Sequence, residues 1–250
     1  MLQFEVQNAV ALLRLEHGKA NTIDIELFTE LERKLSELER SPIKAIVLTG
    51  SGNTFSAGVD LFRVVEEGAE YIQRFLPLLS SGLQKLFLFP KPVIAAVNGH
   101  AIAGGCLLVS CGDYRIMSEG TIGMPELVVG VPFPSFILEI VRFIAPPQFL
   151  QEIVYTGRTY TPEDARVRGL VDETTSQESL LSRAFEMANV LASAPSEAFR
   201  LTKTQLRSLV VERARSFQVD EDLMRLWCAP ETHAVIKAYL QKTIGKSKRG

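Results

Sequence analysis

The apolar positions in the first half of the chain form short continuous runs, separated by longer segments of helical spacing. Residues 45–50 and 93–97 are almost entirely apolar and lead into glycine-containing turns. Such runs are typical of strands that are buried on both faces of a parallel sheet. Two short strands are also expected within residues 4–17, and another over residues 113–117. Strands that alternate with helices predict an α/β core.

Leucines at helical spacing predict the first helix. The predicted helix covers residues 23–40, and four residues form its apolar stripe: Leu27, Leu31, Leu35 and Leu38. Thr22 or Asp24 can cap its first turn. After a loop over residues 51–60, a second helix is expected over residues 70–88, ending where two prolines follow.

Helical patterns dominate from residue 134 onward. Thr161 and Asp164 lie three residues apart and form a capping box, which predicts a helix start. The chain contains no Gly/Pro/Ser-rich linker and no internal repeat. We therefore expect no sharp domain boundary. The chain is divided into an α/β core over residues 1–160, which holds the active site, and a helical C-terminal region over residues 161–250.

Composition is that of an ordinary globular protein with a packed core. Hydrophobic residues make up 46% of the 250 residues, charged residues 22%, and the net charge is −2. This charge gives no preference for a polyanion, so nucleic acid is not an expected partner. Residues 92–112 carry no charge and are long enough to span a membrane. Their polar residues and four glycines favour a buried strand, a turn and a short helix instead.

The expected location is the cytoplasm. Three cysteines are few, and their odd number does not allow all of them to pair, so a disulfide framework is not expected. This favours a reducing compartment. The thiols of Cys106 and Cys111 have apolar neighbours and are expected to be buried. The first residues have no signal-peptide pattern, and the last three do not form a peroxisomal signal.

Two loops rich in small residues each follow a predicted buried strand. They cover residues 55–61 (FSAGVDL) and 98–106 (NGHAIAGGC). Gly104 and Gly105 open a predicted helix, where free N–H groups can bind an anionic oxygen. A tight turn with no ligand is the alternative interpretation of the same glycines, and a solvated carboxylate in a turn is the alternative for Glu126 further along.

These loops belong to a longer ordered set of motifs that extends over nearly the whole chain. The set comprises residues 18–22 (GKANT), 46–50 (IVLTG), 55–61, 91–99 (KPVIAAVNG), 103–106 (AGGC), 123–127 (GMPEL) and 156–171. In content and order it resembles the crotonase, or enoyl-CoA hydratase/isomerase, superfamily. The resemblance implies a spiral of ββα units followed by a helical trimerisation region, hence a homotrimer or homohexamer. It also implies a coenzyme A thioester as substrate, with no separate cofactor and no metal.

The resemblance assigns roles to particular residues. The thioester oxygen would lie between the backbone N–H groups of Val59 and Gly104, which would stabilise the negative charge of an enolate. Ala103 departs from the family, which usually has glycine there. Other residues are expected to bind the substrate: Lys19 and Ala20 at its nucleotide end, and also Ala57, Gly58, Asp60, Leu61, Leu107 and Pro125. Asp60 is expected to organise its loop as well. His100 is expected to be structural.

The acid/base residues distinguish between reactions of this family. Hydratases use two glutamates around a water molecule, whereas this chain has Leu107 at the first position and Glu126 at the second. One carboxylate can move a proton from C2 to C4, as in single-glutamate Δ3,Δ2-enoyl-CoA isomerases. Residues 130–136 also resemble the apolar segment of those isomerases. An isomerase is therefore the predicted function.

Three alternatives stay open at this point. The chain could be an enoyl-CoA hydratase or another lyase of the family. It could form a carbon–carbon bond, because residues 124–127 also resemble carboxymethylproline synthase. It could be a non-catalytic acyl-CoA-binding or RNA-binding relative, although the near-neutral charge and Glu126 weigh against this.

Overall fold

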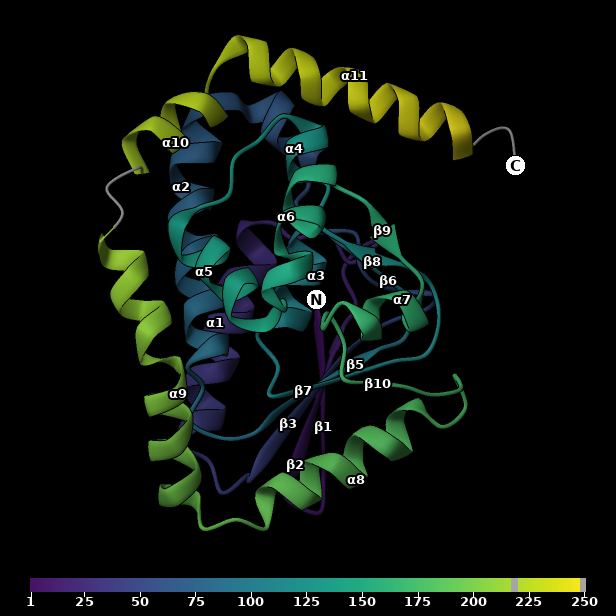
Figure 1. Cartoon of the computed structure of the whole chain (residues 1–250), viewed down its shortest axis with the longest axis vertical. Helices are drawn as coiled ribbons and strands as arrows, with labels where there is room; N and C mark the ends of the chain where they lie inside the picture. Colours follow the sequence, from purple (N-terminus) through teal and green to yellow (C-terminus); the bar gives the residue numbers. More distant parts are fainter. Residues whose placement is uncertain (217–219, 248–250) are drawn as a thin grey trace.

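Two β-sheets and the helices around them form the structure, a computed structural model that describes residues 1–216 and 220–247 (Figure 1). The larger sheet has the order β1-β2-β3-β5-β7-β10. Its strands are β1 (Leu2–Gln7), β2 (Val10–Leu15), β3 (Ala45–Gly50), β5 (Val93–Val97), β7 (Tyr114–Met117) and β10 (Glu173–Thr174). Only the β1–β2 pair is antiparallel. The strands expected in residues 4–17, 45–50, 93–97 and 113–117 are thus all present.

A smaller sheet pairs strands that follow those of the larger one. It has the order β4-β6-β8-β9, with strands β4 (Thr54–Ser56), β6 (His100–Ile102), β8 (Ile122–Gly123) and β9 (Thr159–Tyr160). Consecutive strands alternate between the two sheets: β3 then β4, β5 then β6, β7 then β8. A helix follows each pair, namely α2 (Leu61–Phe87), α3 (Gly104–Ser110) and α4 (Glu126–Val129). These three ββα units confirm the predicted spiral.

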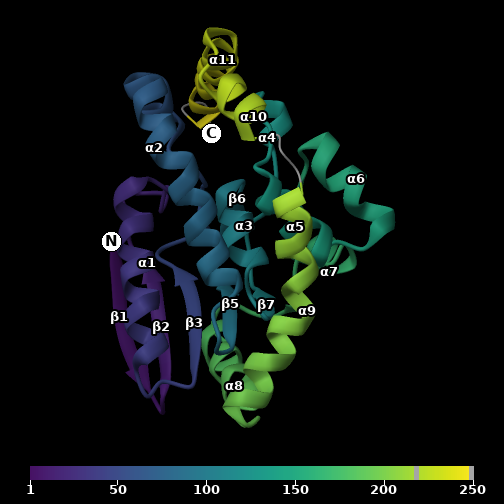
Figure 2. The same ribbon diagram turned by 90° about the vertical axis from the view of Figure 1, so that its left-hand side faces the viewer.

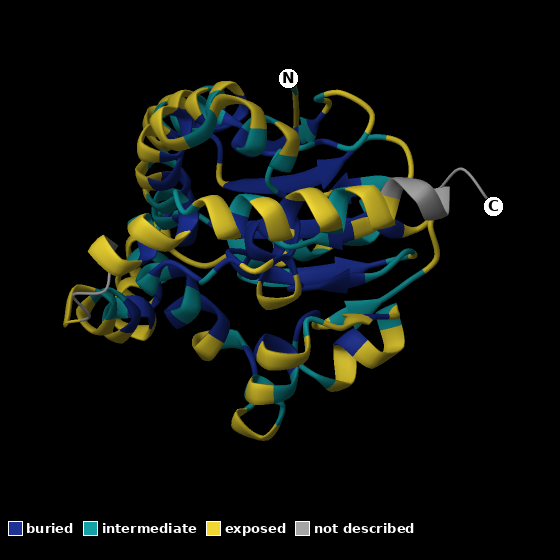
Figure 3. Ribbon diagram, turned by 90° about the horizontal axis from the view of Figure 1, so that it is seen from above, coloured by how far each residue is buried: buried dark blue, intermediate teal, exposed yellow. Residues whose placement is uncertain are grey.

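Strands β3 and β5 in the middle of the large sheet are buried on both faces, as their continuous apolar runs predict (Figure 3). Alternate side chains of β3 point to opposite faces. Ile46 and Leu48 join the core beneath α1 (Ile25–Arg40) and α2, whereas Ala45 and Val47 pack with α8 (Leu180–Ala192). One strand therefore contributes to two hydrophobic clusters.

The first helix matches its prediction and the second begins earlier than expected. Asp24 caps α1 by accepting a hydrogen bond from the Leu27 amide, and the leucine stripe is buried. Helix α2 begins at Leu61 rather than near residue 70, because the Asp60 carboxylate caps its first turn. Gly68 interrupts it with non-helical angles, φ 66° and ψ −147°. This break explains why the helical pattern is clear only after it.

The charge-free stretch of residues 92–112 forms β5, β6 and α3, all inside the fold. In the described part of the chain, no helix has the length and apolarity needed to cross a membrane. Cys106 and Cys111 are buried, as their apolar neighbours predict.

Helices dominate the remainder of the chain and return to the core (Figure 2). They are α5 (Ser135–Ile144), α6 (Pro147–Thr156), α7 (Pro162–Val167), α8, α9 (Ser196–Ser216), α10 (Asp220–Trp227) and α11 (Pro230–Ser247). Thr161 caps α7 through the Asp164 amide, as predicted. Helix α9 packs along α5, while α10 and α11 lie against α2. The division near residue 161 and the assembly into a trimer or hexamer stay predictions.

A buried ion cluster anchors α9 to the core. Lys203 and Arg207 contact the two carboxylate oxygens of Asp113 at 2.6 and 2.8 Å. Arg207 also donates to the carbonyl oxygens of Cys111 and Gly112. Because a buried charge needs such partners, these contacts fix where α9 runs along the core.

Candidate active site

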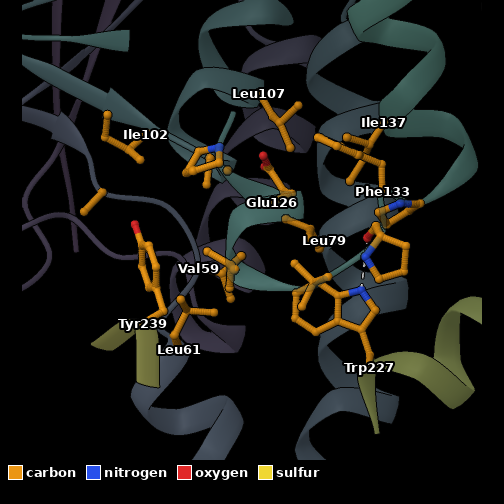
Figure 4. Close-up of a pocket in the computed structure, with 18 residues that line it drawn as sticks. Val59, Leu61, Leu79, Ile102, Leu107, Glu126, Phe133, Ile137, Trp227 and Tyr239 are labelled. Atoms are coloured by element: carbon orange, nitrogen blue, oxygen red, sulfur yellow. Dashed lines mark hydrogen bonds between the residues drawn. The ribbon is translucent and has the colours of Figure 1, made fainter. Parts of the chain in front are cut away.

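An apolar cavity lies where the loops after β4 and β6 meet α4 and the C-terminal helices (Figure 4). Aliphatic and aromatic side chains make up most of its lining: Leu61, Leu79, Ile102, Leu107, Val129, Val131, Phe133, Ile137, Trp227 and Tyr239. Three predicted catalytic groups, Val59, Gly104 and Glu126, also line it. A few convergent polar groups in an apolar cavity are typical of a binding site for a small organic ligand.

The loop that carries Val59 is held by Ile23. The Ile23 amide donates to the Gly58 carbonyl oxygen at 2.8 Å, and the Ile23 carbonyl oxygen accepts from the Asp60 amide at 3.0 Å. These two bonds flank Val59 and fix the orientation of its peptide group. Gly58 takes a φ of +85°, which favours glycine, so the local sequence suits this turn.

The second amide comes from Gly104, the first residue of α3, so no carbonyl of that helix can accept its N–H. A methyl group on Gly104 would lie 3.6 Å from the amide nitrogen of Val59. The two loops are therefore in contact. Within residues 1–216 and 220–247, neither the Val59 nor the Gly104 amide donates a hydrogen bond. Two free donors that border one cavity are the arrangement expected for an anionic oxygen.

Glu126 faces this cavity from the first turn of α4. Glu126 is only 8% exposed, and its Oε2 atom has no hydrogen-bond partner among the described residues. Burial raises the pKa of Glu126 to about 8, because the charged carboxylate loses its hydration. A carboxyl group with such a pKa can accept and return a proton near neutral pH.

The raised pKa predicts a pH-dependent stability difference between wild type and Glu126→Gln. The unfolded glutamate ionises near 4.5, whereas the folded one keeps its proton until about 8. Between these values the unfolded state binds fewer protons, so wild-type stability falls as pH rises. We expect the glutamine variant to gain on the order of a few kcal/mol over wild type from pH 5 to pH 8. Urea unfolding of both proteins at several pH values measures this, and a pH-independent difference would contradict the buried carboxyl.

Leu107 occupies the position at which a second acid would be needed. It lies beside the Glu126 carboxyl group (Figure 4) and is 3% exposed. An isobutyl group can neither orient nor ionise water. Among the residues that the structure describes, Glu126 supplies the single carboxyl group of the cavity lining.

Four predicted substrate contacts lie outside the lining, whereas Ala57, Leu61, Leu107 and Pro125 belong to it. Lys19 is exposed, and the carbonyl oxygen of Ala20 accepts from the Ala57 amide at 2.9 Å. Asp60 caps α2, and Gly58 shapes the loop from a buried position. Any contact between these four residues and a substrate stays a prediction. His100 hydrogen-bonds Thr121, which fits its expected structural role.

Ala103, the departure from the family, takes φ +51° and ψ −120°. Non-glycine residues rarely adopt these angles, and such strain costs on the order of 1–3 kcal/mol. The Ala103 amide donates to the Gly123 carbonyl oxygen at 2.8 Å, and its carbonyl oxygen accepts from the Leu107 amide at 3.1 Å. These bonds hold the strained residue in place and set the direction of the next peptide, which carries the Gly104 amide.

The C-terminal helices contribute residues that the sequence did not assign to the site. Trp227 from α10 and Tyr239 from α11 line the cavity together with Leu79 and Ile102. The cavity therefore crosses the division near residue 161, and the site is not confined to residues 1–160. The single tryptophan of the chain was the only available signal for this part of the lining.

Comparison with known proteins agrees with the fold. The sequence profile of the enoyl-CoA hydratase/isomerase family matches residues 5–247. A putative enoyl-CoA hydratase of Thermus thermophilus is 32% identical over 84% of each chain. The mitochondrial enoyl-CoA delta isomerase 1 of Mus musculus is 25% identical over 85% of this chain and 75% of its own. One of these relatives is named for hydration and the other for isomerisation.

A solved structure shows the same fold over the full length. The human mitochondrial Δ3,Δ2-enoyl-CoA isomerase superposes with a TM-score of 0.93, covering 100% of this chain and 99% of that one, at 22% identity. At this identity the likeness concerns the fold alone. The profile match and the ββα spiral agree: the chain belongs to the enoyl-CoA hydratase/isomerase family, that is, to the crotonase superfamily.

Proposed function

We propose that this protein is a Δ3,Δ2-enoyl-CoA isomerase in which Glu126 alone moves the proton. The observation that carries the proposal is the isolation of this carboxyl group. It is buried with one oxygen unpartnered, Leu107 stands beside it, and two unused backbone amides border the same cavity. A hydratase would need a second group to hold and activate water.

In the first step, the Glu126 carboxylate takes a proton from C2 of a 3-enoyl thioester. The electron pair of the C2–H bond moves toward the carbonyl carbon, and the thioester oxygen gains negative charge. The N–H groups of Val59 and Gly104 donate to this oxygen in a site from which water is excluded. A preorganised donor of this kind contributes about 3 kcal/mol in a studied enzyme.

In the second step, the protonated Glu126 returns the proton to C4. The enolate re-forms the carbonyl group, and the double bond moves from C3–C4 to C2–C3. Atoms and electrons balance within substrate and carboxyl group, so the proposed reaction requires no redox cofactor and no metal. An apolar site also protects the dienolate from solvent protons.

Paired substrates test the proposal. The purified protein is given 3-hexenoyl-CoA and 2-hexenoyl-CoA separately, and the conjugated thioester and 3-hydroxyhexanoyl-CoA are quantified by chromatography. We expect conjugated 2-enoyl product from the first substrate and no more hydration of the second than in a protein-free control. Efficient hydration would assign a hydratase instead, and no turnover of either substrate would favour carbon–carbon bond formation or binding without catalysis.

A further inference from the structure

We propose that Trp227 closes the acyl end of the cavity and thereby sets the longest acyl chain that the site accepts. This inference rests on the proposed function, since it assumes that the cavity holds the acyl part of a thioester. It concerns a residue of α10, far along the chain from both amides and from Glu126.

A gradient of exposure gives the direction of the cavity. At one end, Ala57 is exposed, while Leu61 and Tyr239 are half-buried. At the other end, Ile137 and Trp227 are 1% and 3% exposed. In Figure 4, Ile102 and Tyr239 lie on one side of Glu126, and Phe133, Ile137 and Trp227 lie on the opposite side. The cavity therefore has an open end and a closed end with the carboxyl group between them.

This direction fixes how a thioester would lie. The coenzyme A moiety is large and charged, so it must leave through the open end. The acyl chain then runs from the two amides past Glu126 toward the closed end. Trp227 stands at that end, where the last carbons of a long chain would arrive.

Trp227 is held firmly enough to act as a stop. Its indole N–H donates to the Pro132 carbonyl oxygen at 3.2 Å, and its own carbonyl oxygen accepts from the His233 ring at 3.0 Å. The first bond joins α10 to the segment that carries Phe133. An indole has few rotatable bonds, so a buried, hydrogen-bonded tryptophan rarely moves aside for a ligand.

The chemistry of the closed end selects an unsubstituted hydrocarbon tail. Its lining consists of aliphatic and aromatic side chains, and the indole N–H and the Pro132 carbonyl oxygen satisfy each other. A hydroxyl or carboxyl group on the tail would be buried there without a partner, which is unfavourable. Methylene groups, in contrast, gain roughly fourfold in affinity each when buried, on the basis of about 0.8 kcal/mol per group.

Calorimetric titration with saturated acyl-CoAs tests the proposal without catalysis. Butanoyl-, hexanoyl-, octanoyl-, decanoyl- and dodecanoyl-CoA are titrated into wild type, Trp227→Ala and Trp227→Leu. In wild type, affinity should rise with chain length and then stop rising. We call the chain length at which affinity stops rising the break. In Trp227→Ala the break should move to a chain at least two carbons longer, so that this longer thioester binds the variant about tenfold more tightly than it binds wild type. Trp227→Leu should move the break less, and it covers the case that the alanine variant does not fold.

A matched control separates the limit that Trp227 sets on chain length from general effects of altering α10. Leu226 precedes Trp227 on the same helix but is 45% exposed and outside the lining, so Leu226→Ala should leave the break unchanged. An unshifted break in both folded Trp227 variants would overturn the role of Trp227 while leaving the isomerase proposal intact. Failure of wild type to bind any acyl-CoA would instead overturn both.

Discussion

Replacing Glu126 by glutamine is expected to lower isomerase turnover about 10²–10⁴-fold while acyl-CoA affinity stays within a few-fold of wild type. Glutamine keeps the shape of the side chain but cannot accept the C2 proton. No other carboxyl group lines the cavity, so nothing in the described structure can replace it. Steady-state kinetics with 3-hexenoyl-CoA gives the loss in turnover, and calorimetry with hexanoyl-CoA gives the affinity.

A second buried glutamate provides the control. Glu139 in α5 is 3% exposed, but it pairs with Arg142 and lies outside the lining. Glu139→Gln should therefore change stability more than turnover. Equal losses of turnover in both variants would point to a general effect of altering a buried carboxyl group. Unchanged turnover in Glu126→Gln would remove Glu126 from the proposed mechanism.

The sequence predicted the larger sheet well, and the reason lies in how that sheet is buried. Because β3 and β5 contribute to cores on both faces, nearly all their side chains must be apolar, and such runs are easy to recognise. The hydrophobic pattern did not indicate the smaller sheet, which the family resemblance alone implied, because its strands have only two or three residues. Such strands are too short for a periodic pattern, and they form only because the spiral stacks one loop on the next.

The site residues likewise fall into those that the sequence predicted and those that it did not. Glu126, Val59 and Gly104 lie in short motifs whose order along the chain identifies them, and the structure places all three on one cavity. Trp227 and Tyr239 belong to C-terminal helices that carry no motif of the site, so their apolar residues could pack against any surface. In the fold, the Asp113 ion cluster holds α9 to the core, and α10 and α11 lie against α2, which is far from them in the sequence. The local sequence does not indicate which surface these helices cover.

The contact between the two amide loops leads to the second large prediction, which concerns Gly58. Its φ of +85° is already unfavourable for alanine. An added methyl group would also lie 2.6 Å from the Ile102 carbonyl oxygen and 3.0 Å from the Gly104 amide nitrogen. Backbone atoms cannot yield as a flexible side chain does, so the loops must separate. The amides of Val59 and Gly104 would then move apart, and under the proposed mechanism they could no longer both donate to the thioester oxygen.

Gly58→Ala is therefore expected to lower kcat about 10²–10³-fold, the loss typical of removing one oxyanion donor. Gly52→Ala is the matched control, because Gly52 lies in the turn between β3 and β4 and also has a positive φ, +62°, but no heavy atom lies within 4 Å of an added methyl group. Backbone strain should cost each variant on the order of 1–3 kcal/mol of stability, measured by urea unfolding, and Gly58→Ala should lose more than Gly52→Ala because its methyl group also clashes with the second loop. Only Gly58→Ala should lose turnover, since only there does the methyl group push on the second loop. Near-normal kcat in a folded Gly58→Ala protein would mean that stabilisation of the enolate does not depend on the approach of these two amides.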